Sequence, residues 1–161
     1  VLTTMLSSEE KAGHNDTKAL RPADEEIHMP GSYVNHPAVI AQNDNMISIN
    51  NVECGPNGAV RLESIGSLQY SGSGGQSDTA IGALHAKNGW NIIAVKSVAH
   101  TKQGDVSAIN AQLPKGSVVT LSRNDIDYIV TEYGIAPMRG RSARERVNNL
   151  IAVAHPSYRE Q

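Results

Sequence analysis

Residues 71–97 read SGSGGQSDTAIGALHAKNGWNIIAVKS, and this stretch decides the fold class of the chain. It opens with a glycine-rich loop, residues 71–75, and continues into a helix that we expect over about residues 78–87. The apolar run at residues 91–95 is rich in β-branched side chains and has the length of a buried strand. The expected buried side of the helix consists of small and aliphatic residues: Ala80, Ile81, Ala83 and Leu84. A loop, a helix and a buried strand in this order predict one unit of an α/β layer structure.

Further segments extend this pattern in both directions along the chain. Residues 46–49 alternate apolar and polar side chains like a half-buried strand, and β-branched residues favour strands at 117–121 and 128–131. A last helix is expected from Ser142 to about Ala154, where Ser142 and Glu145 form a capping box. Its apolar residues recur at helical spacing: Ala143, Val147, Leu150, Ile151 and Ala154. We therefore predict an α/β fold with a mainly parallel or mixed sheet and flanking helices.

The chain divides into an irregular first segment and one domain. Residues 1–31 are polar, mixed in charge and interrupted by Pro22 and Pro30, so we expect a poorly packed remnant of an upstream part that this chain lacks. Residues 32–161 have the length of a single domain with one core. The chain begins with Val1 rather than methionine, as a processed chain or a piece of a longer protein would.

The composition bounds the class of protein. Hydrophobic residues make up 39% and charged residues 19%, and no apolar run approaches the ~20 residues of a membrane helix. A net charge of −2 gives no basic surface for nucleic acid. The single Cys54 cannot form an internal disulfide, and no signal peptide opens the chain. The six histidines show no metal-ligand spacing. We expect a soluble cytoplasmic protein without a metal, a membrane or a nucleic-acid partner.

The glycine-rich loop is the strongest local signal for chemistry. Its glycines permit positive φ angles and the close approach of a ligand to main-chain N–H groups, and we expect Ser77 or Asp78 to cap the helix that follows. Unpaired N–H groups and the helix dipole favour negative charge at this N-terminus, such as a phosphate or a thioester oxyanion. The alternative is a flexible turn without a ligand. The loop is neither a G-x-G-x-x-G fingerprint nor a P-loop with its lysine.

Several motifs follow one another in the order found in one known family. They are residues 43–50 (NDNMISIN), 63–66 (ESIG), 71–76 (SGSGGQ), 122–134 (SRNDIDYIVTEYG), 144–146 (RER) and 154–156 (AHP). From about Tyr33 to its end, the chain resembles the C-terminal domain of the acetyl-CoA hydrolase/transferase family. This family contains the family I CoA-transferases of the acetate and 4-hydroxybutyrate type, and also acyl-CoA hydrolases. Each motif alone is weak evidence, whereas their combination is specific.

The resemblance implies a ping-pong transfer of CoA between an acyl-CoA and a short-chain carboxylate. In the family a glutamate attacks the thioester and carries CoA as a glutamyl-CoA thioester, which is covalent catalysis by a carboxylate. We expect this glutamate upstream of Val1, because neither Glu9 nor Glu10 sits in the matching motif, and Glu53 and Glu63 are expected to be structural. CoA is then a substrate, with no tightly bound cofactor. The implied partners are the upstream half of the same protein and further copies in a homo-oligomer.

The resemblance also assigns CoA-binding positions. Gly74 matches the family's CoA-contacting glycine, with Gly75 and Gln76 beside it, and Asn50 matches a second CoA-contacting position. Relatives have a CoA-contacting lysine after the strand at residues 91–95. Lys102 is the best candidate for this cation and His100 is the second, since here the loop is longer and Lys96 replaces a proline that is usual in relatives.

Other readings remain open from the sequence. The chain could belong to an acyl-CoA hydrolase, in which water takes the acyl group, or it could be a noncatalytic CoA-binding module. The coding sequence upstream of Val1 would distinguish an enzyme fragment from such a module. A basic cluster at Arg139, Arg141, Arg144 and Arg146 is typical of a solvated surface, with CoA phosphates or a neighbouring subunit as the alternative partner. We expect a structural role for residues 132–134, at the end of a strand.

Overall fold

The fold is known from a computed structural model of the 161-residue chain. The structure describes residues 29–51, 53–54, 58, 60–61, 64–65, 68–69, 72–101, 104–113 and 115–160. The predicted irregular segment at residues 1–31 lies almost entirely outside these ranges, so its predicted poor packing stays a prediction.

Short helices, strands and two larger helices alternate along the described chain. The α-helices are α1 (Gly31–Val34), α2 (Pro37–Ile40), α3 (Gln76–His85) and α4 (Ala143–Val153), and the 3-10 helices are η3 (Arg123–Asp125) and η4 (Pro156–Tyr158). The strands are β1 (Ile47–Asn51), β2 (Glu53–Cys54), β3 (Val60–Arg61), β4 (Ser64–Ile65), β5 (Leu68–Gln69), β6 (Trp90–Ala94), β7 (Val98–Thr101), β8 (Gly104–Ser107), β9 (Tyr128–Thr131) and β10 (Gly134–Pro137).

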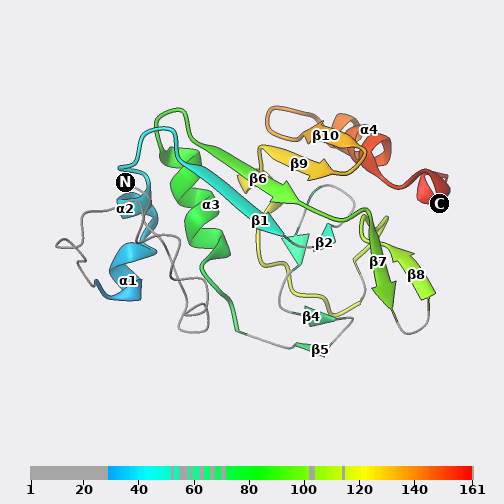
Figure 1. Ribbon diagram of the computed structural model, residues 1–161, viewed down its shortest axis with the longest axis horizontal. Coiled ribbons are helices and arrows are strands. Elements are labelled where there is room, and N and C mark those ends of the chain that lie inside the picture. Colours follow the sequence, from blue (N-terminus) through cyan, green and yellow to red (C-terminus); the bar gives the residue numbers. More distant parts are fainter. Residues whose placement is uncertain are drawn as a thin grey trace, which may run out of the picture.

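A four-stranded sheet forms the centre of the structure, with the strand order β1-β6-β9-β10 (Figure 1). Strand β6 pairs in parallel with both β1 and β9, whereas β10 returns antiparallel to β9. This mixed sheet confirms the predicted fold class. The remaining strands form three separate hairpins: β2-β3, β4-β5 and β7-β8.

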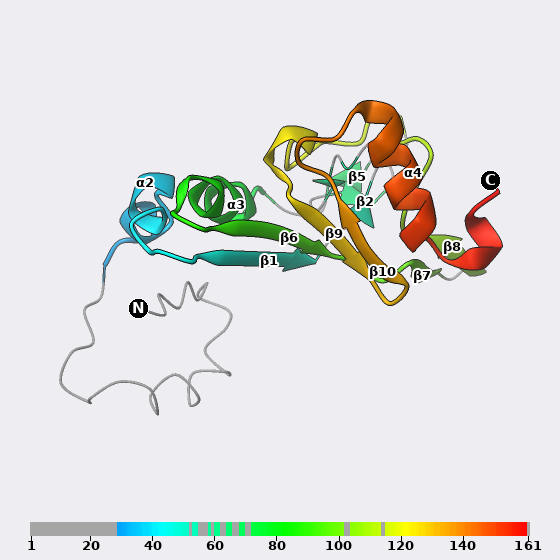
Figure 2. The same cartoon turned by 90° about the horizontal axis from the view of Figure 1, so that it is seen from above.

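Helices α3 and α4 lie on the same face of the sheet (Figure 2). The core between helices and sheet contains Ile93 of β6, Ile129 of β9 and Leu150 of α4, each at most 2% exposed. The capping box of Ser142 and Glu145 forms as predicted, and α4 ends before Ala154. Helix α4, however, buries Arg146, Leu150 and Val153, so its predicted apolar side is only partly correct.

Strand β1 shows the reverse of the usual burial pattern. The alternation at residues 46–49 does mark a strand, but the polar Ser48 is buried while Ile47 and Ile49 are exposed. Ser48 faces α3, where its hydroxyl donates to Thr79 Oγ1 at 3.2 Å. The two isoleucines therefore point to the face of the sheet that no described helix covers.

The predicted strand at residues 117–121 is wrong. This segment is irregular, and Val118 and Val119 are exposed while Leu121 alone is buried. The segment runs past α3 instead of joining the sheet, held where Ser77 Oγ donates to the Thr120 carbonyl at 2.8 Å. A β-branched run favours an extended backbone but does not supply a neighbouring strand with which to pair.

A buried carboxylate fixes the amino end of the sheet. Asp127 is 2% exposed, and its Oδ2 accepts a hydrogen bond from the backbone N–H of Asn91 at 2.8 Å. Its Oδ1 lies 2.6 Å from Arg139 Nε, close enough for an ion pair although the N–H is not aligned for a hydrogen bond. This cluster ties the start of β9 to β6 and to the turn after β10.

Candidate functional site

The candidate site lies at the carboxyl edge of the parallel strands. The chain leaves β1 at this edge, returns through the glycine-rich loop, and enters α3, whose N-terminus lies beside the carboxyl ends of β1 and β6 (Figure 1). In open α/β sheets, ligand-binding groups gather at this edge, because strand ends and helix N-termini meet there. The topology thus places Asn50 and the glycine-rich loop on the same edge.

A chain of hydrogen bonds links Asn50 to the first turn of α3. Asn50 Nδ2 donates to Ser48 Oγ at 2.9 Å, and Ser48 Oγ donates to Thr79 Oγ1 at 3.2 Å. Thr79 Oγ1 in turn donates to the Gln76 carbonyl at 3.0 Å. Two residues that the sequence singled out separately, Asn50 and Gln76, are therefore held together by the buried polar side of β1.

The glycine-rich loop enters α3 without a side-chain cap. The helix begins at Gln76, earlier than predicted, and Gly75 is its N-cap residue. Ser77 and Asp78 lie inside the first turn, so the prediction that one of them caps the helix is wrong. The N–H groups of this first turn receive no capping side-chain oxygen, and a helix N-terminus in this state favours an anion.

The glycines of this loop are not needed for positive φ angles. None of Gly72, Gly74 and Gly75 has positive φ, so the loop does not use the positive φ angles that its glycines permit. A Cβ added at Gly72 or Gly74 would meet no atom of the described residues within 4 Å, whereas one at Gly75 would lie 3.1 Å from Asn35 Nδ2. Gly74 thus borders open space, so any need for glycine there comes from something that approaches the loop from outside.

Gln76 carries a buried amide without an internal partner. The residue is 5% exposed, and neither Nε2 nor Oε1 has a hydrogen-bond partner among the residues that the structure describes. A buried amide of this kind is unusual, since more than about 90% of buried polar groups are paired. Gln76 therefore marks the start of α3 as a place where a ligand or another segment would supply hydrogen bonds.

The carboxyl ends of β6 and β9 are joined by a pair that the sequence did not reveal. Glu132, just after β9, accepts hydrogen bonds from Ser97 Oγ at 2.5 Å and from Ser97 N at 3.0 Å. These bonds, the hydroxyl first, lower the pKa of Glu132 below its ordinary value of 4.5. The carboxylate holds the loop after β6 in place, which agrees with the structural role expected for residues 132–134. In the sequence, the signal for this pair is a glutamate directly after the strand predicted at residues 128–131.

We expect Glu132→Gln to weaken the acid dependence of stability. The pKa of Glu132 is lowered in the folded state, so its contribution is complete above about pH 4.5 and is lost as the pH falls through the folded pKa. Urea unfolding between pH 3 and 6 should show a shallower fall in unfolding free energy for Glu132→Gln than for the unchanged protein. Ser97→Ala removes the hydroxyl donor but keeps the backbone N–H donor, so it should give a smaller change in the same direction. Acid profiles that are unchanged in both variants would contradict this account.

The predicted cation is not brought to the loop by any described residue. Lys102 lies outside the described residues. His100, the second candidate, is exposed on β7, and its Nδ1 lies 2.6 Å from Asp105 Oδ1 across the hairpin. The β7-β8 hairpin extends beyond the carboxyl end of β6, away from the N-terminus of α3 (Figures 1 and 2).

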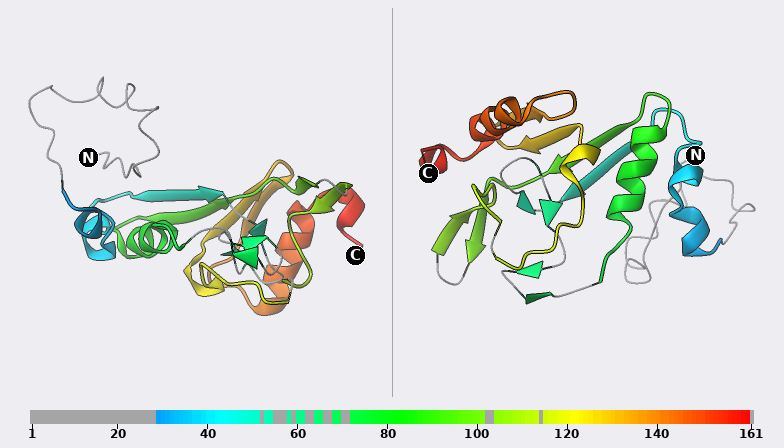
Figure 3. Two further views of the ribbon diagram at one scale, coloured as in Figure 1. Left: turned by 90° about the horizontal axis from the view of Figure 1, so that it is seen from below. Right: turned by 180° about the vertical axis from the view of Figure 1, so that it is seen from behind.

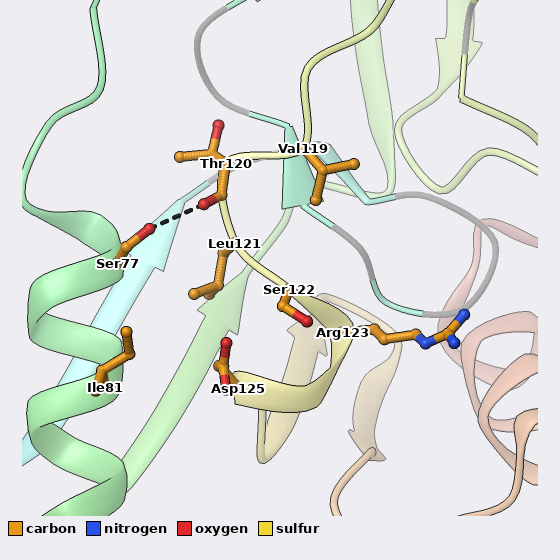
Figure 4. A pocket seen from close by; sticks show the side chains of 8 residues that line it. All are labelled: Ser77, Ile81, Val119, Thr120, Leu121, Ser122, Arg123 and Asp125. Atoms are coloured by element: carbon orange, nitrogen blue, oxygen red, sulfur yellow. Dashed lines mark hydrogen bonds between the residues drawn. The ribbon is translucent and has the colours of Figure 1, made fainter.

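A cavity of about 460 Å³ adjoins the first turns of α3. Ser77 and Ile81 form one wall and the segment 119–123 forms the other, with Asp125 at the base (Figure 4). The side chain of Arg123 points away from Ser77 and Ile81 (Figure 4). Among the described lining residues, a carboxylate and hydroxyl groups face the cavity while the cation Arg123 does not, which is a poor match for a CoA phosphate.

The basic cluster near α4 is largely engaged within the protein. Arg139 pairs with Asp127, and buried Arg146 donates to the carbonyls of Met138 at 3.0 Å and Arg123 at 2.5 Å. Arg139, Arg141 and Arg144 are exposed, as expected of a solvated surface, and only buried Arg146 departs from that expectation. No group of three or more potential metal ligands occurs in the described part of the chain. None of the described helices is both long and apolar enough to cross a membrane.

Comparisons with known proteins give one consistent result. Residues 19–161 match the family described as the acetyl-CoA hydrolase/transferase C-terminal domain. The chain is 50% identical over 129 residues to 4-hydroxybutyrate coenzyme A transferase of Clostridium kluyveri, matching 80% of this chain and 30% of that relative. It is 46% identical over 135 residues to succinyl-CoA:cyclohexane-1-carboxylate CoA transferase of Geobacter metallireducens, matching 83% and 30%.

A solved structure shares the fold as well as the sequence. The crystal structure of 4-hydroxybutyrate CoA-transferase from Porphyromonas gingivalis superposes with a TM-score of 0.64 at 37% identity, covering 82% of this chain and 29% of that one. The chain therefore spans about a third of the length of the curated relatives and of the solved structure that it matches.

Proposed function

Because this chain belongs to the acetyl-CoA hydrolase/transferase family, whose C-terminal domain it matches, we propose that it is the CoA-binding part of a CoA-transferase. The enzyme moves CoA between an acyl-CoA and a short-chain carboxylate. The observation that carries the proposal is the site at the carboxyl edge, where Asn50, the glycine-rich loop and the buried Gln76 meet at the uncapped start of α3.

The geometry supports a role in polarising the thioester. The first-turn N–H groups of α3 point out of the helix start, and open space lies beside Gly74. A thioester carbonyl in that space would receive hydrogen bonds that strengthen as negative charge develops on its oxygen. Asn50 and Gln76 would hold the neighbouring part of CoA, and the hydrogen-bond chain through Ser48 and Thr79 would keep both in place.

The reaction proceeds in two covalent steps. A glutamate carboxylate attacks the acyl carbonyl carbon, the C–S bond breaks, and CoA leaves as a thiolate from an acyl-glutamyl anhydride. The thiolate then attacks the glutamyl carbonyl, which forms the glutamyl-CoA thioester and releases the acid. The acceptor carboxylate reverses these steps with its own acyl group. We place this glutamate in the polypeptide upstream of Val1, and Lys102 remains the proposed cation for CoA.

An acyl-CoA hydrolase is the second candidate, because the family contains both activities. It differs in that water hydrolyses the enzyme intermediate, so that the glutamate is regenerated and CoA leaves as a free thiol instead of passing to a carboxylate. A noncatalytic CoA-binding module would use the same site without either step. Measuring free thiol and new acyl-CoA in the same reaction separates these activities, since hydrolysis releases CoA while transfer conserves the thioester.

Gln76→Leu tests the site through two opposite effects. Leucine has a similar volume and removes the unpaired amide, so the ligand-free protein should become more stable by about 1 kcal/mol. CoA binding by the complete natural polypeptide should weaken by about tenfold or more, measured by isothermal titration calorimetry. Gln42→Leu, on the exposed Gln42, is the matched control and should change neither quantity. Unchanged CoA affinity in Gln76→Leu would remove this residue from the site.

A further inference from the structure

A second candidate site is the cavity beside α3, which the proposed CoA site does not use. The segment 119–123 and η3 lie beside α3 on the helix-covered face of the sheet (Figure 3), and the cavity lies between them and the first turns of α3. Its volume of about 460 Å³ is within the range of small-molecule sites, about 300–1,000 Å³. Among the described residues, its lining includes neither Asn50 nor Gln76.

The polar groups that face this cavity are mainly hydrogen-bond acceptors. Asp125 is half-buried, and its carboxylate has no hydrogen bond or ion pair with a described residue. Ser77 Oγ donates its single proton to the Thr120 carbonyl at 2.8 Å, so toward a ligand it can only accept. Ser122 Oγ accepts from the backbone N–H of Asn124 at 3.2 Å and keeps a second lone pair. A ligand that matches this lining must therefore be a donor.

The charge and shape of the lining favour a cation with an apolar part. Asp125 is the carboxylate of the described lining, while the side chain of Arg123 points away (Figure 4), and a buried carboxylate costs free energy unless a cation pairs with it. Ile81, Val119 and Leu121 form an apolar wall, along which methylene groups can lie while a charged head reaches the oxygen atoms.

We propose that this cavity binds a primary ammonium group carried on a short aliphatic arm. An ammonium has three N–H donors and no acceptor, which suits the oxygen atoms of Asp125, Ser77 and Ser122. A planar guanidinium binds best to two parallel oxygen atoms, whereas these three acceptors come from both walls of the cavity. A free alkylamine and the lysine side chain of a neighbouring polypeptide segment present the same chemistry. The inference involves no step of CoA transfer, so it holds or fails independently of the proposed function.

Methyl NMR of the complete natural polypeptide, labelled at the isoleucine δ1 methyl groups, follows the cavity through Ile81. At about pH 7 and constant ionic strength, butylamine should shift the Ile81 signal saturably and leave that of Ile151, exposed on α4, unchanged. Butanol has the same arm without the charge, and tetramethylammonium has the charge without an N–H donor. Both should bind at least about tenfold more weakly than butylamine, the scale of a lost hydrogen bond to a charged group.

Asp125→Asn should weaken butylamine binding by at least about tenfold. Asp44→Asn is the matched control, since exposed Asp44 pairs with Lys87 outside the cavity, and it should change binding by less than about twofold. The comparison of the three probes uses the unchanged protein, so it tests the proposal even where Asp125→Asn does not fold.

Carbodiimide coupling distinguishes a free amine from a lysine that already occupies the cavity. The reagent activates the Asp125 carboxylate, and a lysine Nζ in contact with it displaces the activated group and forms an amide, with the net loss of one water. Peptide mapping by mass spectrometry locates the link. A butylamine shift without a cross-link identifies a free amine, and a cross-link without a shift identifies a lysine; both support the proposal. Equal binding of butanol, equal butylamine binding in Asp125→Asn, or neither a shift nor a cross-link overturns it.

Discussion

The 161-residue chain by itself is expected to form no butyryl-CoA from acetyl-CoA and butyrate, while the complete natural polypeptide turns over at an ordinary enzyme rate of about 1–10³ s⁻¹. The reason is the nucleophile. Glu132 is held by hydrogen bonds from the hydroxyl and the backbone N–H of Ser97, and we expect no glutamate of this chain to lie in the family's catalytic motif. Product formation is measured by liquid chromatography of the CoA esters.

The companion measurement separates a missing nucleophile from a misfolded chain. The isolated chain should show cooperative unfolding in urea followed by circular dichroism, so that inactivity is not a failure to fold. Transfer activity in the isolated chain would place the nucleophile within it. Substituting each of Glu9, Glu10, Glu53 and Glu63 by glutamine would then identify which residue was misjudged.

Local sequence signals predicted the elements whose causes are local. Strand β9 forms at the β-branched run predicted as a strand, residues 128–131, and the capping box at Ser142 and Glu145 starts α4 as expected. A capping box involves side chains and N–H groups within a single turn, so its residues determine it without help from the rest of the fold. The mixed sheet followed from the order of such elements.

The errors arose where burial depends on distant parts of the polypeptide. The alternation of apolar and polar side chains in β1 predicted a strand, but it did not indicate which face of that strand is covered. Ser48 is buried through its contact with α3, which lies far along the chain. Residues 117–121 had strand composition but run beside α3, where Leu121 makes an isolated β-bridge instead of joining a strand of the sheet. Arg146 lies on the buried side of α4, where an apolar residue was expected. Its guanidinium can be buried there because it donates hydrogen bonds to backbone carbonyls.

The candidate site was predicted through resemblance rather than through residue patterns. Nothing in spacing alone joins Asn50 to Gln76, which are linked through two hydroxyl groups from different elements. The Ser97–Glu132 pair was missed for the same reason, since its members are 35 residues apart. Sequence reasoning identified the loop as chemically unusual, and the topology supplied its neighbours.

Gly74→Ala is expected to lower kcat/KM for acyl-CoA by roughly 10²-fold in the complete natural polypeptide, the scale of losing one oxyanion-hole donor. Because Gly74 has no positive φ and an added Cβ meets no atom within 4 Å in the described part of the chain, the substitution should leave stability unchanged or raise it by less than about 1 kcal/mol. The loss should appear mainly in kcat, as expected when a group assists the transition state more than the bound substrate.

Gly72→Ala is the matched control for this variant, since Gly72 has the same open surroundings and no positive φ. Steady-state kinetics and thermal melting of both variants separate three causes. Loss of activity in Gly74→Ala alone means that the thioester approaches the loop at that position. Equal losses in both variants mean that the loop acts through its backbone freedom, and normal kinetics in both mean that it is only a turn. We expect the first outcome because a methyl group at Gly74 meets no atom of the described residues within 4 Å, so the proposed substrate is the group that it would obstruct.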